Sequence, residues 1–280
     1  MTILVFTGIL FLGALAAGLL GSLTGLGGGV VLIPLLTLVF KVDIHYAIGA
    51  SLISVIATSS GAAAAYVREG ITNIRLGMFL ELATTVGAIT GAFLAAYLST
   101  SFISILFGFI LILSSVLSLI RQQDHIEKVP GGRWSRVLRL NNSYPTPAGP
   151  QAYSVKNIGA GFIMMNIAGI VSGLLGIGSG ALKVIAMDTV MRVPFRVSTT
   201  TSNFMIGVTA AASVGIYLHR GYIDPGLSMP VVLGVLTGAF MGTRILTSAK
   251  TKTATLKVIF AIVIFFLALE MIQNGITHKI

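Results

Sequence analysis

Two glycine-rich clusters are the part of this sequence best suited to binding a ligand. A glycine carries no Cβ atom, so a ligand can approach the backbone N–H groups closely. Each cluster also precedes an apolar stretch in which a helix should start, and the start of a helix carries partial positive charge. Both features favour an anion. The clusters and their flanking residues are Thr24, Gly25, Gly27, Gly28, Gly29, Gly176, Gly178, Ser179 and Gly180.

Polar side chains farther along each half extend these two candidate sites. They are Ser51, Ser54, Thr200, Thr201, Ser202 and Asn203. Hydroxyl and amide groups can hold an anionic oxygen without a buried charge. Serine and threonine can instead bond to carbonyl groups of their own helix. For Ser51, Thr201, Ser202 and Asn203 both interpretations stay open.

Few ionisable residues lie within the apolar stretches. Lys183 lies one helical turn beyond the second cluster, and we expect it to take part in the anion site; the alternative is a side chain extended to the cytoplasmic face. Glu81 lies about six residues inside the stretch that follows Arg75, and we expect it at the membrane interface rather than as a proton carrier. The histidines fall in loops or at a terminus, so neither a metal nor another cofactor is expected. No nucleophile–base pair or carboxylate pair occurs at depth, so the sequence does not predict an enzyme.

The composition places these features in a membrane. Of 280 residues, 55% are hydrophobic and 9% are charged, and the mean hydropathy is +0.97. A soluble protein carries about 25% charged residues. The formal net charge of +10 comes from basic residues in short gaps between long apolar stretches. That distribution is typical of a membrane surface and does not indicate a nucleic-acid partner. The chain has no cysteine, which excludes disulfides and thiolate metal sites.

Most of the apolar stretches are long enough to cross a bilayer, which takes about 20 residues. They cover residues 1–40, 46–67, 76–98, 102–120, 157–182, 197–218, 226–243 and 258–277. The first stretch contains the glycines at 25–29, and the arm that follows them spans only about 17 Å at about 1.5 Å per residue. The hydrocarbon core is about 30 Å thick. The glycines therefore break the helix partway through the membrane, and residues 3–40 should form a hairpin with a buried tip.

The second half of the chain repeats the first with an offset of 151 residues. The matched positions are Gly18/Gly169, Gly25/Gly176, Gly27/Gly178, Gly29/Gly180, Ser51/Ser202, Thr58/Thr209, Tyr66/Tyr217, Gly70/Gly221, Leu76/Leu227, Met78/Met229, Gly87/Gly238 and Gly91/Gly242. One register held over this length indicates a duplication. We expect the Gly-x-x-x-Gly spacings at 87–91 and 238–242 to serve helix packing instead of ligand binding.

Parity and charge predict how the two halves sit in the membrane. Each half holds a hairpin with two arms and three further helices, which makes five segments. Because five is an odd number, the second half should start on the opposite side of the membrane and be inverted relative to the first. Fourteen lysines and arginines fall on the side of the central linker and three on the other, which predicts a cytoplasmic linker and two outer termini in the cytoplasmic (inner) membrane. We expect a membrane repeat at 1–120, a basic linker at 121–156 and an inverted repeat at 157–280. In the linker, Trp134, Val137 and Leu138 could lie on the bilayer surface.

These features predict an all-α polytopic membrane protein, an inverted-repeat transporter with a broken-helix hairpin and three transmembrane helices in each half. Non-helical backbone survives at membrane depth only where protein or a polar cavity surrounds it. Secondary transporters use such breaks, which meet near the midplane and bind the substrate during alternating access. An anion channel with the tips as a filter is the alternative.

A family resemblance adds a substrate class to this prediction. The sequence GLGGGVVLIP at 25–34, followed by Ala50-Ser51-Leu52 and Gly61, resembles the TauE/SafE sulfite exporter family, also called the 4-toluene sulfonate uptake permease family. The stretches 176–180 and 201–207 are similar to the second copy of that family's motif. The resemblance covers nearly the whole chain outside the linker. It implies transport of sulfite, an organosulfonate or a related sulfur anion, with export expected and a proton or sodium as the coupling ion.

The second cluster departs from the pattern of that family in two positions. Ser179 stands where the family often has glycine, and Ile185 stands where the first copy has Pro34. We therefore expect the two tips to contribute unequally to the site.

Overall fold

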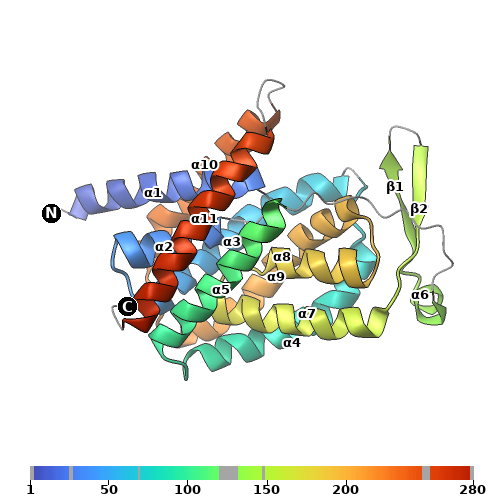
Figure 1. The fold of residues 1–280 in the computed structure, drawn as a ribbon, viewed down its shortest axis with the longest axis horizontal. Helices are drawn as coiled ribbons and strands as arrows, with labels where there is room; N and C mark the ends of the chain where they lie inside the picture. Colours follow the sequence, from blue (N-terminus) through green and yellow to red (C-terminus); the bar gives the residue numbers. More distant parts are fainter. Residues whose placement is uncertain are drawn as a thin grey trace.

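The fold is seen in a computed structural model, which describes residues 3–24, 28–68, 70–119, 132–146, 149–247 and 253–277. Helices dominate this part of the chain, and most of them lie lengthwise in one bundle (Figure 1). The elements are α1 (Ile3–Thr24), α2 (Gly29–Pro34), η1 (Leu35–Val39), α3 (Ile44–Arg68), α4 (Ile74–Ala95), α5 (Thr100–Leu119), α6 (Arg133–Val137), β1 (Asn142–Thr146), β2 (Gly149–Tyr153), α7 (Ile158–Leu175), α8 (Gly180–Ile185), η2 (Ala186–Val190), α9 (Phe195–His219), α10 (Pro225–Thr247) and α11 (Thr253–Ile276). The η elements are π-helical.

Six of the described helices are long and apolar enough to cross a membrane: α1, α3, α4, α7, α9 and α10. Shorter apolar helical segments cover Gly29–Val39, Thr100–Val116 and Ala261–Ile276. The prediction of an all-α polytopic membrane protein is therefore confirmed. A helix satisfies every backbone N–H and C=O within the segment itself, which is why apolar chains of this length adopt it in lipid.

The outer surface of the bundle is as apolar as its interior. On α4, Met78, Leu82 and Val86 follow one another at four-residue spacing and are exposed, while Leu80 and Ala83 on the other face are buried. Side chains four residues apart share one face of a helix. A face of this kind in a soluble protein would carry charges, so the exposed side of α4 is suited to lipid.

The lengths of the elements repeat with the 151-residue offset. The pair α2 and η1 has six and five residues, as has the pair α8 and η2, and α3 and α9 have 25 residues each. Each short arm ends in a left-handed residue at equivalent positions, Lys41 with φ 55° and Arg192 with φ 57°. The packing of helices across the halves repeats as well. Helix α1 packs on α10, and their counterparts in the repeat, α7 and α4, pack on each other. In Figure 1, α1 and α7 run in opposite directions, which is what an inverted duplication predicts.

Glycines allow these two helix pairs to approach to backbone contact. A Cβ atom on Gly91 of α4 would overlap the carbonyl oxygen of Ile170 in α7, and one on Gly173 of α7 would overlap that of Ala88 in α4. Gly238 of α10 lies in the same way against Leu15 of α1. The packing role predicted for Gly87-x-x-x-Gly91 and for Gly238 is therefore confirmed, because small residues are what let membrane helices come this close.

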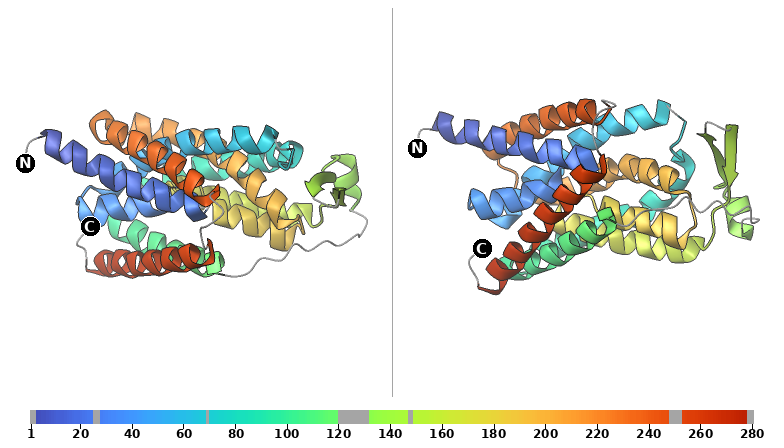
Figure 2. Two further views of the ribbon diagram at one scale, coloured as in Figure 1. Left: turned by 90° about the horizontal axis from the view of Figure 1, so that it is seen from above. Right: turned by 45° about the horizontal axis from the view of Figure 1, so that its top comes forward.

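The central linker has more structure than its polar composition suggests. Its described part forms α6 and an antiparallel hairpin in which Asn142 pairs with Tyr153. Four linker side chains, Leu140, Tyr144, Tyr153 and Val155, are buried in a cluster with residues of α4, η2 and α9. Trp134 and Val137 are exposed, at 69% and 65%. Both further views place this unit at one end of the bundle and the two labelled termini at the other (Figure 2).

Asn73 joins the linker to the bundle. Its side-chain nitrogen donates hydrogen bonds to the carbonyl oxygen of Leu140 (2.9 Å) and to the hydroxyl of Tyr153 (2.8 Å), and its side-chain oxygen accepts one from the N–H of Leu76 at the start of α4 (3.0 Å). Burial raises the pKa of the Tyr153 hydroxyl well above its usual value, so it remains a neutral partner. One residue thus caps α4 and fixes the hairpin.

Replacing Asn73 by alanine should loosen the linker. Loss of an N-cap costs about 0.5–2 kcal/mol, and 1 kcal/mol changes an opening equilibrium about fivefold. We expect trypsin to cleave after the exposed Arg139 about fivefold faster or more in the purified Asn73→Ala variant. Asn142→Ala, at an exposed position in β1, is the matched control. Equal cleavage rates in the two variants would show that Asn73 does not hold the linker.

Candidate functional site

The two hairpin tips meet in the interior of the protein. The second hairpin breaks where predicted. Its first helix, α7, ends at Leu175, and Gly176 (φ 66°) and Gly178 (φ 70°) adopt left-handed conformations before α8 begins. The carbonyl oxygen of Gly176 accepts a hydrogen bond from Ser51 of α3 (2.8 Å). A Cβ atom on Gly29, the first residue of α2, would lie 2.5 Å from that serine oxygen and 3.4 Å from the oxygen of Gly176. A side chain at position 29 would therefore displace the Ser51 hydroxyl from its present position.

Three serines brace the second tip. Ser179 lies in the tip itself, with a left-handed backbone (φ 43°), and donates to the carbonyl oxygen of Ala168 in α7 (2.6 Å). Ser202 of α9 donates to the carbonyl oxygen of Gly180 (3.1 Å). Ser51 and Ser202 occupy equivalent positions of the repeat, yet both bond to the second tip. The unequal contribution of the two tips stays a prediction.

A small pocket lies beside the point where the tips meet. It is lined by Val30 from α2, by Ile110 and Ser114 from α5, and by Ile177, Ser179, Gly180, Ala181 and Leu182 around the second tip. Its walls are largely apolar, with two hydroxyl groups. The space is narrow, so a ligand larger than a small anion could enter only if the tips moved.

The remaining predicted site residues have different surroundings. Ser54 and Thr200 bond to carbonyl groups one turn earlier in their own helices, so the structural interpretation applies to them. Thr201 instead accepts a hydrogen bond from the backbone N–H of Asn73 (3.1 Å), and Asn203 is half-buried on the same helix. Thr24 is the last residue of α1 and Gly28 directly precedes α2, while Gly25 and Gly27 lie outside the described residues.

A buried polar triad joins α8, the helix that follows the second tip, to α9 in the same half and to α4 in the first half. The amino group of Lys183 in α8 donates to the hydroxyl of Thr209 in α9 (2.5 Å). The same hydroxyl lies 2.7 Å from Oε1 of Glu81 in α4. Lys183 is 0% exposed and Glu81 is 8% exposed. The alternative in which Lys183 extends to the cytoplasmic face is therefore wrong. Glu81 is buried among helices, and its position at the membrane interface stays a prediction.

The sequence contains a weak signal for this triad. Thr209 lies seven residues after Ser202, which is about two helical turns, so both side chains project from the same face of α9. The repeat alignment shows Thr209 only as the match of Thr58. Since Glu81 and Lys183 are far apart in sequence, their proximity follows from the packing of α4 and α8 on α9.

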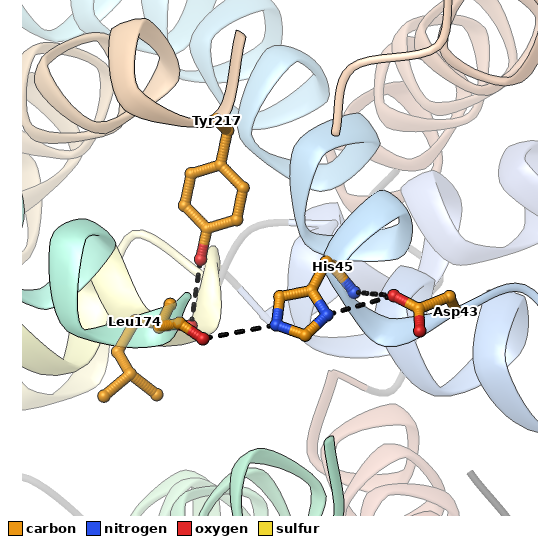
Figure 3. A network of polar contacts seen from close by, with 5 residues as sticks. Asp43, His45, Leu174 and Tyr217 are labelled. Atoms are coloured by element: carbon orange, nitrogen blue, oxygen red, sulfur yellow. Dashed lines mark hydrogen bonds and ion pairs between the residues drawn. The ribbon is translucent and has the colours of Figure 1, made fainter. Parts of the chain in front are cut away.

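Further polar contacts join helices in two pairs, α3 to α4 and α9 to α7 (Figure 3). The ring of His45, at the start of α3, faces the Asp43 carboxylate through Nδ1 (3.0 Å) and the carbonyl oxygen of Ala95 in α4 through Nε2 (3.2 Å). The Tyr217 hydroxyl of α9 donates to the carbonyl oxygens of Gly173 and Leu174 in α7 (both 3.2 Å). The hydrogen bond from His45 lowers the pKa of Asp43, which lies in the loop before α3.

Comparison with known proteins points to one family. The family described as "Sulfite exporter TauE/SafE" matches residues 10–271. The probable membrane transporter protein YunE of Bacillus subtilis (strain 168) is 29% identical over 277 residues, covering 96% of this chain and 98% of that protein. YdhB of the same organism, also a probable membrane transporter protein, is 29% identical over 228 residues (81% and 85%). A probable membrane transporter protein of Xylella fastidiosa (strain 9a5c) is 25% identical over 261 residues (93% and 91%). No solved structure matches the chain.

Proposed function

Because this chain belongs to the sulfite exporter TauE/SafE family and is therefore a multi-pass membrane transporter, we propose that it moves a small sulfur-containing anion by alternating access. Sulfite, or an organosulfonate of similar size, is the proposed substrate class, and export is the direction that the family's description favours. The observation that carries the proposal is the pocket lined by Val30 of the first arm and by Ser179 to Leu182 of the second. A site shared by two broken hairpins is the arrangement that alternating access requires.

The electrostatics of the pocket suit an anion. Lys183 directly follows the pocket residue Leu182, and it is buried with its amino group among protein atoms. An amino group in this low-dielectric region attracts an anion more strongly than it would in water. The hydroxyl group of Ser114 can orient an oxyanion without adding charge, whereas that of Ser179 would first have to leave the carbonyl oxygen of Ala168. Ser51 and Ser202 act by holding the second tip in shape.

The two halves are proposed to be inverted repeats in the cytoplasmic membrane. The opposite directions of α1 and α7 and the pairing of α1 with α10 and of α7 with α4 support the inversion. The excess of basic residues on the linker side supports a cytoplasmic linker, and the position of both termini at the other end of the bundle agrees with outer termini (Figure 2). Rocking of one half against the other would then open the pocket to each side in turn.

Thermal-shift binding tests the substrate class. The purified protein would be titrated with sulfite, thiosulfate, methanesulfonate, sulfate and acetate, since a ligand that binds the folded state raises Tm by mass action. We expect at least one of the first three anions to stabilise the protein. Stabilisation by acetate alone would contradict the substrate class. In proteoliposomes, saturable flux that responds to a coupling ion distinguishes the transporter from the channel alternative, which is not favoured by the names of the relatives.

Filling the pocket should stop transport. Ala181 is half-buried and lines the pocket, so the added carbons of Ala181→Leu would occupy the substrate's space. Overpacking costs about 1–3 kcal/mol, and about 1.4 kcal/mol is a factor of ten, so sulfite flux into proteoliposomes should fall about tenfold to a hundredfold. Ala211→Leu, the same change at an exposed position of α9, should transport normally. Normal flux in Ala181→Leu would remove this pocket from the transport path.

A further inference from the structure

Within the buried triad of Glu81, Thr209 and Lys183, the glutamate has a chemistry that the anion site does not use. The Glu81 carboxylate bonds through Oε1 to Thr209 (2.7 Å) and more weakly to Thr85 (3.4 Å), while its Oε2 is buried with no hydrogen-bond partner. A buried carboxylate oxygen without a partner is costly, because water no longer solvates it. Protonation of the carboxyl group on Oε1 removes the charge, and Oε2 is then a neutral carbonyl oxygen whose burial costs less. The geometry therefore favours a group that can carry a proton.

We propose that Glu81 binds the coupling proton of transport and that Lys183 is its counter-charge. This inference rests on the proposed function, since it assigns the coupling ion to the same anion transporter. When Glu81 is ionised, its negative charge offsets the positive charge of Lys183 across the Thr209 hydroxyl. When Glu81 is protonated, the charge of Lys183 is no longer offset and attracts an anion to the neighbouring pocket. Proton binding and anion binding thus favour each other.

The Thr209 hydroxyl can serve both protonation states without movement of heavy atoms. It has one proton, and two acceptors lie within reach, Glu81 Oε1 at 2.7 Å and the carbonyl oxygen of Met205 at 2.9 Å. Toward an ionised Glu81 the hydroxyl donates. Toward a protonated Glu81 it accepts, and its own proton turns to Met205. Its second lone pair accepts from Lys183 in both states.

The charged groups around the triad are few, which keeps the coupling local. The helices packed on α4 are α7 and α9. The sequence of α7 contains no ionisable side chain, and that of α9 has ionisable groups only toward its two ends. The charged groups of these and the adjoining elements are Arg75 at the start of α4, Lys183 in α8, Asp188 in η2, and Arg196 and His219 at the ends of α9, and the tyrosines are Tyr217 of α9 and Tyr144 and Tyr153 of the linker. Lys183 shares a hydrogen-bonded hydroxyl with Glu81 and is therefore its principal partner.

The triad suits a proton better than a sodium ion. A sodium ion bound to Glu81 would lie beside the Lys183 ammonium group, and the two positive charges would repel each other in a low-dielectric interior. Hard metal cations also prefer several oxygen ligands. A proton needs one oxygen only. Since proton and anion binding assist each other, both move in the same direction, and export requires an outward anion gradient that exceeds the inward proton gradient.

Infrared difference spectroscopy tests the proton site without any substrate. Spectra of the purified protein between alkaline and acidic buffer should show the band of a buried protonated carboxyl group that titrates. The band should be absent from Glu81→Gln and present in Glu270→Gln, a matched change at an exposed glutamate of α11. A band that persists in Glu81→Gln would overturn the proposal.

Anion binding tests the coupling. Methanesulfonate stays ionised across this pH range, so any pH dependence belongs to the protein. Its affinity for the wild type and for Glu270→Gln should rise by about fivefold or more on acidification, whereas the affinity of Glu81→Gln should not depend on pH. In proteoliposomes, an acidic exterior should drive methanesulfonate inward in the wild type and not in Glu81→Gln. An unchanged pH dependence in Glu81→Gln would overturn the coupling. If Glu81 produces the infrared band but no sulfur anion binds the wild type, the substrate class fails and the proton site stands.

Discussion

Gly173→Leu should leave no folded, monodisperse protein after extraction from the membrane. Gly173 of α7 lies against the backbone of Ala88 in α4, so that even a Cβ atom would overlap the Ala88 carbonyl oxygen. Overpacking a core usually costs about 1–3 kcal/mol because neighbouring side chains can shift. Here the obstacle is backbone, so the two helices would have to separate. Size-exclusion profiles of the solubilised protein would measure the loss.

The same helix supplies the control for this prediction. Gly159 lies near the start of α7, is exposed and would place its Cβ atom in open space, so Gly159→Leu should behave as the wild type. Gly173→Ala should give an intermediate result, with a lowered Tm. Normal profiles for Gly173→Leu would mean that α4 and α7 do not pack as closely as the structure indicates.

Lys183→Met should destabilise the protein by about 3–5 kcal/mol at neutral pH, because removal of one partner from a buried charge pair leaves the other uncompensated. Here the remaining charge is Glu81, which keeps one bond to Thr209 and has no partner for Oε2. The loss should shrink on acidification, since a protonated Glu81 carries no charge. Denaturant or thermal unfolding in detergent would measure it.

A double mutant separates this charge effect from simple loss of packing. Glu81→Gln combined with Lys183→Met removes both charges, so most of the stability should return. Lys41→Met, at an exposed position before α3, should have little effect at any pH. If the double mutant is as unstable as Lys183→Met alone, the two residues are not an energetically coupled pair.

Much of this architecture can be predicted from composition and spacing. A bilayer about 30 Å thick imposes lengths on apolar segments, so residue counts alone reveal the helices α3, α4, α9 and α10. The same reasoning predicts the break between α7 and α8, because a short arm beyond Gly180 cannot cross. The family motif at 25–34 and the match over residues 10–271 agree on the transporter class. The substrate, coupling ion and orientation remain proposals.

Other predictions from the sequence were incomplete because they depended on distant contacts. In the sequence, Tyr144 and Tyr153 look like part of a polar connection. In the fold they lie in the two strands of a hairpin and are buried against α4 and α9. Ser51 and Ser202 could be ligands or helix-bonded hydroxyls, and the fold makes them donors to the second tip. Neighbouring residues along the chain do not reveal such partners.

The local sequence therefore accounts for the repeated glycine breaks, because helix length and glycine's conformational freedom are properties of short segments. It does not account for what surrounds each break. Glu81, Lys183 and Thr209 come from α4, α8 and α9, and the packing of α9 between the two halves brings them together. The burial of Glu81 illustrates the difference, because it depends on which helices cover that face of α4, and here α9 covers it.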